Sequence, residues 1–302
     1  DLYIDVHVTD GADYQYDITY GWNGPHAWSP NIADWLDDQF RPDVNRALSA
    51  AGHVPGPLIF SANGRDMNDG MLSWTATPRF SNGWGDARHL ASILVENHSL
   101  KPYPQRVLGT YVFLQQALKV AGEQRESLRQ ATIKDRFDKQ RDIPLAWKVG
   151  EDRGPIKFRG VQSSQYLSEV SGGLTTKWEG VPVEQEIPLL VMDEATVTIT
   201  KPGYYYIPVE WSHIADRLRD QGILVDVLTE TVEAQVQAYR LTEATLDAAS
   251  TPFEGRARYH SGIPVVEEIN HTFKPGDFRV DTSQSLGTLA TLLLEPQSPD
   301  SY

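Results

Sequence analysis

The sequence has 302 residues, with 41 acidic and 27 basic side chains and a net charge of -14. This length allows two domains or one large one, and a hydrophobic fraction of 40% excludes a mainly disordered chain. An acidic chain without a Lys/Arg cluster argues against nucleic acid and anionic membranes as partners, and no apolar run approaches the roughly 18 residues of a membrane span. Because cysteine is absent, only His and carboxylates remain as metal ligands.

Strands alternate with helices in the first part of the chain. Residues 2–8 alternate between apolar and polar side chains, which predicts a strand with Asp5 and His7 on its polar face. Ser29 and Pro30 indicate the start of a helix that runs to about residue 51. We also expect a strand at 58–60, a loop at 63–85, a strand at 92–95 and a helix at 104–122 with Val107, Leu108, Tyr111, Leu114 and Leu118 at helical spacing. This order predicts an α/β layered sheet.

The pattern changes after a charged segment at 123–142, which predicts a helix with Leu128, Ile133 and Phe137 as its apolar contacts. Beyond it the hydrophobic period falls from about 3.6 to about 2 residues. Strands are expected at 156–158, 189–199, 204–209, 225–241, 265–272 and 278–280, and helices at 212–221 and 284–294. We therefore expect an α/β domain at 1–122, a helical connector at 123–142 and a β-rich module at 143–302.

Two residues of possible chemical importance follow apolar strands. His7 ends the first strand, and Glu96 follows the buried strand at 92–95. Sites in α/β sheets lie at the carboxyl ends of strands, and a carboxylate there must be solvated, paired or used. On spacing alone, a structural histidine is the more frequent role for His7. The alternative role for Glu96 is a carboxylate bonded to loop amides.

Three segments carry a resemblance to a known family: DVHVTDGADY at 5–14, SNGWG at 81–85 and LVENHSLK at 94–101. They resemble the downstream half of the catalytic domain of zinc metallocarboxypeptidases of the carboxypeptidase A (M14) type, especially its large bacterial members. The resemblance covers about residues 1–122. It implies part of a mixed-sheet α/β/α domain, zinc as cofactor, His7 as a zinc ligand and Glu96 as the carboxylate that activates the zinc-bound water.

The chain departs from the family pattern in its ligands. The family's H-x-x-E motif, which supplies two zinc ligands, does not occur here, so the resemblance implies that it lies upstream and that the chain is an internal piece of a longer protein. We therefore expect the isolated chain to bind zinc weakly and to be inactive. In the loop before Glu96, Arg79 and Trp84 are the expected substrate-binding residues. The resemblance also implies a periplasmic or secreted location.

The predicted function is zinc-dependent hydrolysis of peptide bonds by metal-activated water, with a peptide or amide as substrate. One alternative is a zinc amidase or deacylase that acts on a non-peptide substrate. The other is a catalytically degenerate peptide- or carbohydrate-binding module. The competing fold is a single β-sandwich with a carbohydrate-binding role, in which aromatic residues between 14 and 35 stack on sugar. A parallel pairing of the His7 strand with the Glu96 strand distinguishes the α/β fold from the β-sandwich. The sequence does not indicate an oligomeric state.

Overall fold

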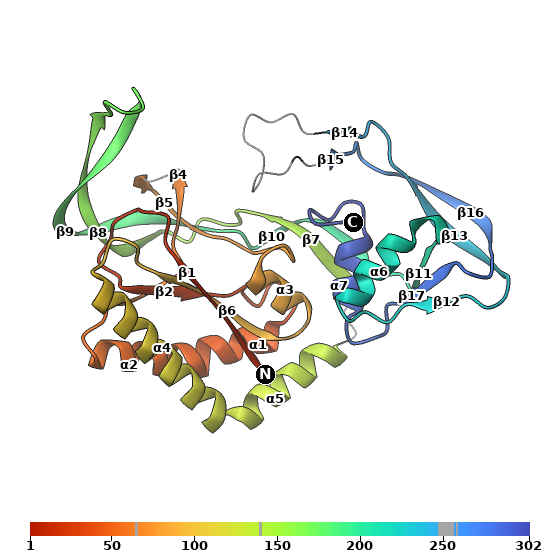
Figure 1. Ribbon diagram of the computed structural model, residues 1–302, viewed down its shortest axis with the longest axis horizontal. Coiled ribbons are helices and arrows are strands. Elements are labelled where there is room, and N and C mark those ends of the chain that lie inside the picture. The colour runs from red at the N-terminus through yellow and green to blue at the C-terminus, as the bar shows by residue number, and fades with distance from the viewer. Residues whose placement is uncertain (64–65, 139–140, 247–256, 258) are drawn as a thin grey trace. The chain divides into compact units, whose positions relative to one another are not determined.

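The protein is described by a computed structural model that covers residues 1–63, 66–138, 141–246, 257 and 259–302. The chain forms two compact units, Asp1–Gln140 with Ala146–Thr196 and Arg141–Leu145 with Val197–Tyr302. Figure 1 shows helices and several small sheets, so the predicted α/β fold with a β-rich region is confirmed. Residues 64–65 of the predicted loop and 139–140 of the predicted connector lie outside the described residues.

The first unit holds most of the helices. Its strands are β1 (Leu2–Val8), β2 (Ile18–Gly21), β3 (Pro55–Pro57), β4 (Phe60–Asn63), β5 (Asp66–Ser73), β6 (Ala91–Asn97), β8 (Pro155–Leu167) and β9 (Leu174–Val191). Its helices are α1 (Pro30–Trp35), α2 (Arg41–Ala50), α3 (Ser81–Ala87), α4 (Tyr103–Glu123) and α5 (Arg125–Phe137), and a π-helical turn at Leu36–Phe40 joins α1 to α2. Strands β7 (Asp142–Lys148) and β10 (Glu194–Thr200) pair with each other and carry the chain between the units.

A four-stranded sheet with the order β1-β6-β2-β3 organises the first unit. Strand β1 runs parallel to β6, and β6 runs antiparallel to β2. Figure 1 shows α1, α2, α4 and α5 together below this sheet. The core between the helices and the sheet contains Ile18 and Tyr20 of β2, Ile93 and Val95 of β6, and Phe113 of α4. The side chains at alternate positions of the same strands therefore point to the opposite face.

The sequence predicted a loop at 63–85, but only part of this segment is a loop. It contains β5, and its end forms the start of α3. Glycines suggested a loop, but Gly83 and Gly85 serve close packing, since a Cβ at Gly83 would lie 2.2 Å from the Thr77 carbonyl oxygen. The strand expected at 58–60 is also wrong, because β3 ends at Pro57 and β4 begins at Phe60.

Helix α4 presents an unexpected side to the sheet. Its buried residues are Gly109, Phe113, Ala117 and Val120. The apolar positions predicted at helical spacing are exposed instead: Val107, Leu108, Tyr111, Leu114 and Leu118. In α5, Leu128 is buried as predicted, but Phe137 is exposed. Two apolar stripes with the same period run along α4. The buried stripe contains Gly109 and Ala117, whose small side chains allow a close approach to the sheet.

The start of α1 is capped by a distant helix. Ser29 occupies the N-cap position, as predicted, but its hydroxyl donates to the Asp86 carbonyl oxygen at 2.6 Å and does not cap the helix. The carboxylate of Asp135 in α5 accepts from the backbone N–H of Asn31 at 3.1 Å and of Ile32 at 2.9 Å. A buried acceptor at these otherwise unpaired N–H groups fixes α5 against α1.

Replacing Asp135 with alanine is expected to lower the free energy of unfolding by about 1 to 3 kcal/mol, because it leaves two buried N–H groups without an acceptor. Urea unfolding followed by tryptophan fluorescence measures this loss. The control is Asp138→Ala, since Asp138 is an exposed carboxylate one turn further along the chain. An Asp135→Ala variant as stable as the control would show that the cap contributes nothing.

The second unit is β-rich. Its strands are β11 (Tyr204–Ile207), β12 (Asp226–Val227), β13 (Val232–Arg240), β14 (Thr245–Leu246), β15 (Tyr259–His260), β16 (Val265–Phe273) and β17 (Phe278–Asp281), with helices α6 (Ser212–Asp220) and α7 (Gly287–Leu294). Both predicted helices are confirmed, whereas the strand expected at 225–241 is divided into β12 and β13. Within the described residues, no helix is both long and apolar enough to cross a membrane.

Candidate functional site

His7 and Glu96 lie side by side at the carboxyl ends of two parallel strands. They are register partners in the β1–β6 pair, and Thr19 of β2 is the register partner of Glu96 on its other side. Because the neighbouring residues Val95 and Ile18 point into the helix-covered core, these three side chains share the opposite face. The parallel pair that the sequence predicted between the His7 and Glu96 strands is thereby confirmed, and it contradicts the β-sandwich alternative.

A carboxylate on the same strand orients the His7 imidazole. Its Nε2 lies 3.0 Å from Oδ2 of Asp5, two positions earlier on the same face of β1. The His7 side chain is 52% exposed, so its Nδ1 can bind a metal ion or accept a hydrogen bond from outside. Metal-binding histidines commonly pair their second nitrogen with a carboxylate in this way. The alternation of Asp5 and His7 in the sequence could have identified this contact.

Glu96 is half-buried, and burial raises the pKa of its carboxyl group. The nearby His7 lowers this pKa, while Asp10 and Asp5 raise it further. In the described part of the chain, Oε2 of Glu96 is a buried oxygen without a hydrogen-bond partner. A carboxylate with these properties is a better proton acceptor near neutral pH than an exposed one.

Close to Thr19 lies a group of buried polar side chains that the sequence did not reveal. The Tyr14 hydroxyl bonds to the side chains of Thr9 and Thr19, and burial raises the pKa of Tyr14 to about 12. The His98 Nε2 lies 3.1 Å from Oδ1 of Asp13, and burial lowers the pKa of His98. Asn97, next to His98, is also buried. The contact between Asp13 and His98 links the loop after β1 to the residue that follows β6.

The two predicted substrate-binding residues, Arg79 and Trp84, lie in the turn before α3 and in α3. The Trp84 ring meets the Tyr3 ring edge to face at 6.3 Å, and the Arg88 guanidinium lies 4.2 Å from its centre. Tyr3 is four residues before His7, which is about 13 Å along a strand. Arg79 is exposed in the turn before α3. Neither contact brings Trp84 to Glu96, and the substrate-binding roles of Arg79 and Trp84 stay predictions.

The aromatic residues near the start of the chain belong to the core. The rings of Tyr14, Tyr16, Tyr20, Trp28 and Trp35 are all buried. They pack against other aromatic rings, for example Tyr20 against Phe113 at 5.0 Å. A side chain must expose its ring face to stack on sugar. These five residues therefore cannot form the stacking platform of the carbohydrate-binding alternative.

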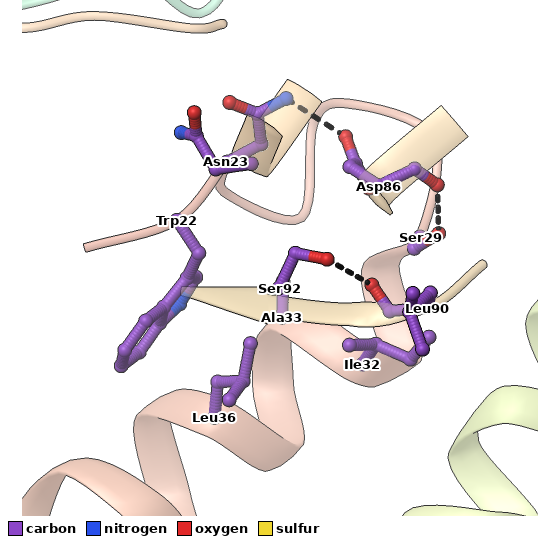
Figure 2. A pocket seen from close by; sticks show the side chains of 10 residues that line it. Trp22, Asn23, Ser29, Ile32, Ala33, Leu36, Asp86, Leu90 and Ser92 are labelled. Carbon is purple, nitrogen blue, oxygen red and sulfur yellow. Dashed lines mark hydrogen bonds between the residues drawn. The ribbon is translucent and has the colours of Figure 1, made fainter. Parts of the chain in front are cut away.

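A buried carboxylate, that of Asp86, lies next to a small cavity between α1 and α3. Asp86 Oδ2 accepts from Asn23 Nδ2 at 2.9 Å, as Figure 2 shows, and from the Trp28 N–H at 3.3 Å. Burial raises the pKa of Asp86 to about 6. The cavity has a volume of about 10 Å³, which is enough for one water molecule. Asn82 Oδ1 also lines it and has no partner among the described residues.

The candidate site contains one histidine and two carboxylates, Asp5 and Glu96, on one face of the β1–β6 pair. His7 offers one ligand atom, Asp5 orients it, and Glu96 offers a proton acceptor beside it. Among the described residues, no group of three or more His, Cys, Asp or Glu side chains could hold a metal ion. Zinc in catalytic sites takes three protein ligands, so the donors here fit zinc in kind but are too few to hold it.

Comparisons with known proteins give a partial relationship. The chain is 31% identical over 109 residues to Carboxypeptidase 2 of Trichophyton tonsurans and to that of Trichophyton rubrum. It is 31% identical over 107 residues to Probable carboxypeptidase 2 of Arthroderma benhamiae. The matched part covers 36% or 35% of this chain and only 20% of each relative. No family model and no solved structure matches the chain. The chain is therefore carboxypeptidase-like over about a third of its length.

Proposed function

We propose that this chain forms part of a zinc-dependent peptidase of the carboxypeptidase type, which hydrolyses a peptide or amide bond with metal-activated water. The observation that carries the proposal is the register pairing of His7 with Glu96 at the ends of parallel strands. The carboxypeptidase-like relatives support peptide hydrolysis as the reaction class. A periplasmic or secreted location and an M14-type identity belong to the same proposal.

Three side chains, those of Asp5, His7 and Glu96, have a role in this proposal. His7 would hold zinc through Nδ1 while Asp5 fixes its ring through Nε2. Bound zinc would lower the pKa of its water to about 7. The Glu96 carboxylate would accept the proton and deliver it to the leaving amine. The proposal also includes two further zinc ligands from polypeptide outside residues 1–302, because His7 alone does not make a catalytic site.

Metal content tests this proposal. The isolated 302-residue chain is expected to lose its zinc on dialysis and to show no peptidase activity, because affinity depends on the number of ligands. A longer polypeptide that contains the same 302 residues and the missing ligands should retain about one zinc per chain. Elemental analysis after dialysis gives both values. A longer polypeptide that retains no zinc would contradict the proposal.

A further inference from the structure

A groove lies along the long hairpin that β8 and β9 form in the first unit (Figure 1). Its volume is about 540 Å³, which is within the range of small-molecule binding sites, about 300 to 1,000 Å³. The buried residues Met67 and Phe158 of the neighbouring core cluster form part of its wall. Its polar lining comes from the loop after β1, from β5 and from the hairpin itself: Asp13, Asn68, Gln162, Ser163, Glu184 and Gln185.

The hairpin is irregular where it lines the groove. Val161 pairs with Pro182, whereas the next paired residue on β8, Ser163, lies opposite Trp178. Gln162 therefore faces the three residues of β9 between Trp178 and Pro182. Such a bulge bends the strands and changes the direction of the side chains next to it. Gln162, Ser163 and Trp178, which lie at the bulge, all line the groove.

The hydrogen-bonding groups at the bulge are not used by the protein. Among the described residues, no hydrogen bond involves the side chain of Gln162, Ser163 or Trp178. Gln185 donates through Nε2 to Oδ1 of Asn68 at 2.9 Å, and this leaves its own amide oxygen as an acceptor. A side-chain amide offers a donor and an acceptor side by side, a hydroxyl offers both on one atom, and an indole offers a donor. The groove therefore presents several unused donors and acceptors next to an aromatic ring.

The charges of the groove favour an uncharged ligand. Its charged side chains are the carboxylates of Asp13 and Glu184, and within the described ranges no Lys or Arg lines it, so it is unsuited to an anion. The Asp13 Oδ1 already lies 3.1 Å from Nε2 of His98 and 4.0 Å from Nζ of Lys101. Glu184 is exposed, and an exposed carboxylate binds a cation weakly. A neutral ligand is therefore the best match.

We propose that this groove binds a neutral oligosaccharide, with one sugar ring stacked on the Trp178 indole and its hydroxyls bonded to Gln162 and Gln185. The apolar C–H face of a sugar ring packs well on an indole. Each sugar hydroxyl both donates and accepts, so a side-chain amide can bond to two neighbouring hydroxyls at once. The inference does not rest on the proposed function, because none of these residues belongs to the candidate zinc site.

A neutral peptide is the less suitable ligand. An extended peptide is commonly bound through main-chain groups along a free strand edge, whereas the unused groups in this groove belong to the side chains of Gln162, Ser163 and Trp178. Side-chain amides beside an indole match the hydroxyls and the C–H face of a sugar more closely than they match a peptide main chain.

Calorimetric titration of the 302-residue chain with three neutral trisaccharides, cellotriose, maltotriose and N-acetylated chitotriose, tests this inference. At least one of them should bind saturably, with a dissociation constant of about 1 mM or lower. Trp178→Ala should weaken that binding at least about tenfold, because it removes the stacking surface. The matched control is Trp211→Ala, since Trp211 is a 54% exposed tryptophan of the second unit, and it should bind the sugar as the unsubstituted chain does.

A second variant keeps the test valid if the Trp178 variant does not fold. Gln162 is exposed, so Gln162→Ala should fold normally and weaken binding about fivefold through the lost hydrogen bonds. Circular dichroism checks the fold of both variants. The inference is overturned if none of the three sugars binds, or if either folded variant binds as tightly as the unsubstituted chain. Binding of N-acetyl-trialanine amide that Trp178→Ala abolishes, without binding of any sugar, would show a peptide groove and would overturn it as well.

Discussion

Replacing Glu96 with glutamine in the longer polypeptide is expected to lower kcat at least about 100-fold and to leave the zinc content unchanged. Glutamine keeps the size of the side chain but cannot accept the proton from the water. Glu96 lies beside His7 and is not itself a proposed ligand, so the metal should remain. Turnover of a peptide substrate and elemental analysis of the same sample measure the two effects.

The matched control for this prediction is Asp10→Asn. Asp10 is an exposed carboxylate whose charge raises the pKa of Glu96, so the control removes one nearby negative charge and leaves the proton acceptor in place. Its effect on turnover should be small in comparison. Undiminished activity of the Glu96→Gln variant would remove Glu96 from the mechanism.

Replacing Asp86 with asparagine is expected to remove a pH dependence of stability. Burial raises the pKa of Asp86 to about 6 in the folded protein, from an ordinary value of about 3.8 in the unfolded chain. The folded state therefore binds the proton more tightly, and its stabilisation is complete below about pH 4 and is lost as the pH rises through about 6. The loss should amount to about 2 to 3 kcal/mol of unfolding free energy.

Urea unfolding of both proteins between pH 4 and pH 7 measures this difference. Asparagine has the size of aspartate and can still accept from Asn23 and Trp28 through its side-chain oxygen. Other titrating groups, such as Glu96 and Asp135, act in both proteins and cancel. If the two stabilities change in parallel over this range, the Asp86 carboxyl is not protonated in the folded protein near pH 5.

The sequence was sufficient to predict the central pair of strands. An apolar strand that ends in His7 and another that ends in Glu96 bring polar groups to one sheet edge, and this depends only on local pattern and on the rule for parallel strands. The Asp5 contact follows from the same alternation. Such features are predictable because they involve residues two positions apart or at matching strand ends.

Features that depend on distant packing could not be predicted. Two stripes of α4 have the same period, and only the sheet decides that Phe113 is buried and Leu118 is not. Gly83 and Gly85 resemble loop glycines until the Thr77 carbonyl and Ser92 are seen to occupy the space beside them. The cap of α1 comes from Asp135, a hundred residues away along the chain, and no local signal identifies it.

The most direct test of the central claim is the zinc content of the longer polypeptide with and without His7→Ala. The proposed site predicts about one zinc per chain in the unsubstituted protein and loss of zinc on dialysis from the variant, because removing one of three ligands weakens binding strongly. Circular dichroism of both samples checks that the variant is folded. Undiminished zinc in a folded His7→Ala variant would show that His7 is a structural histidine and would contradict the account.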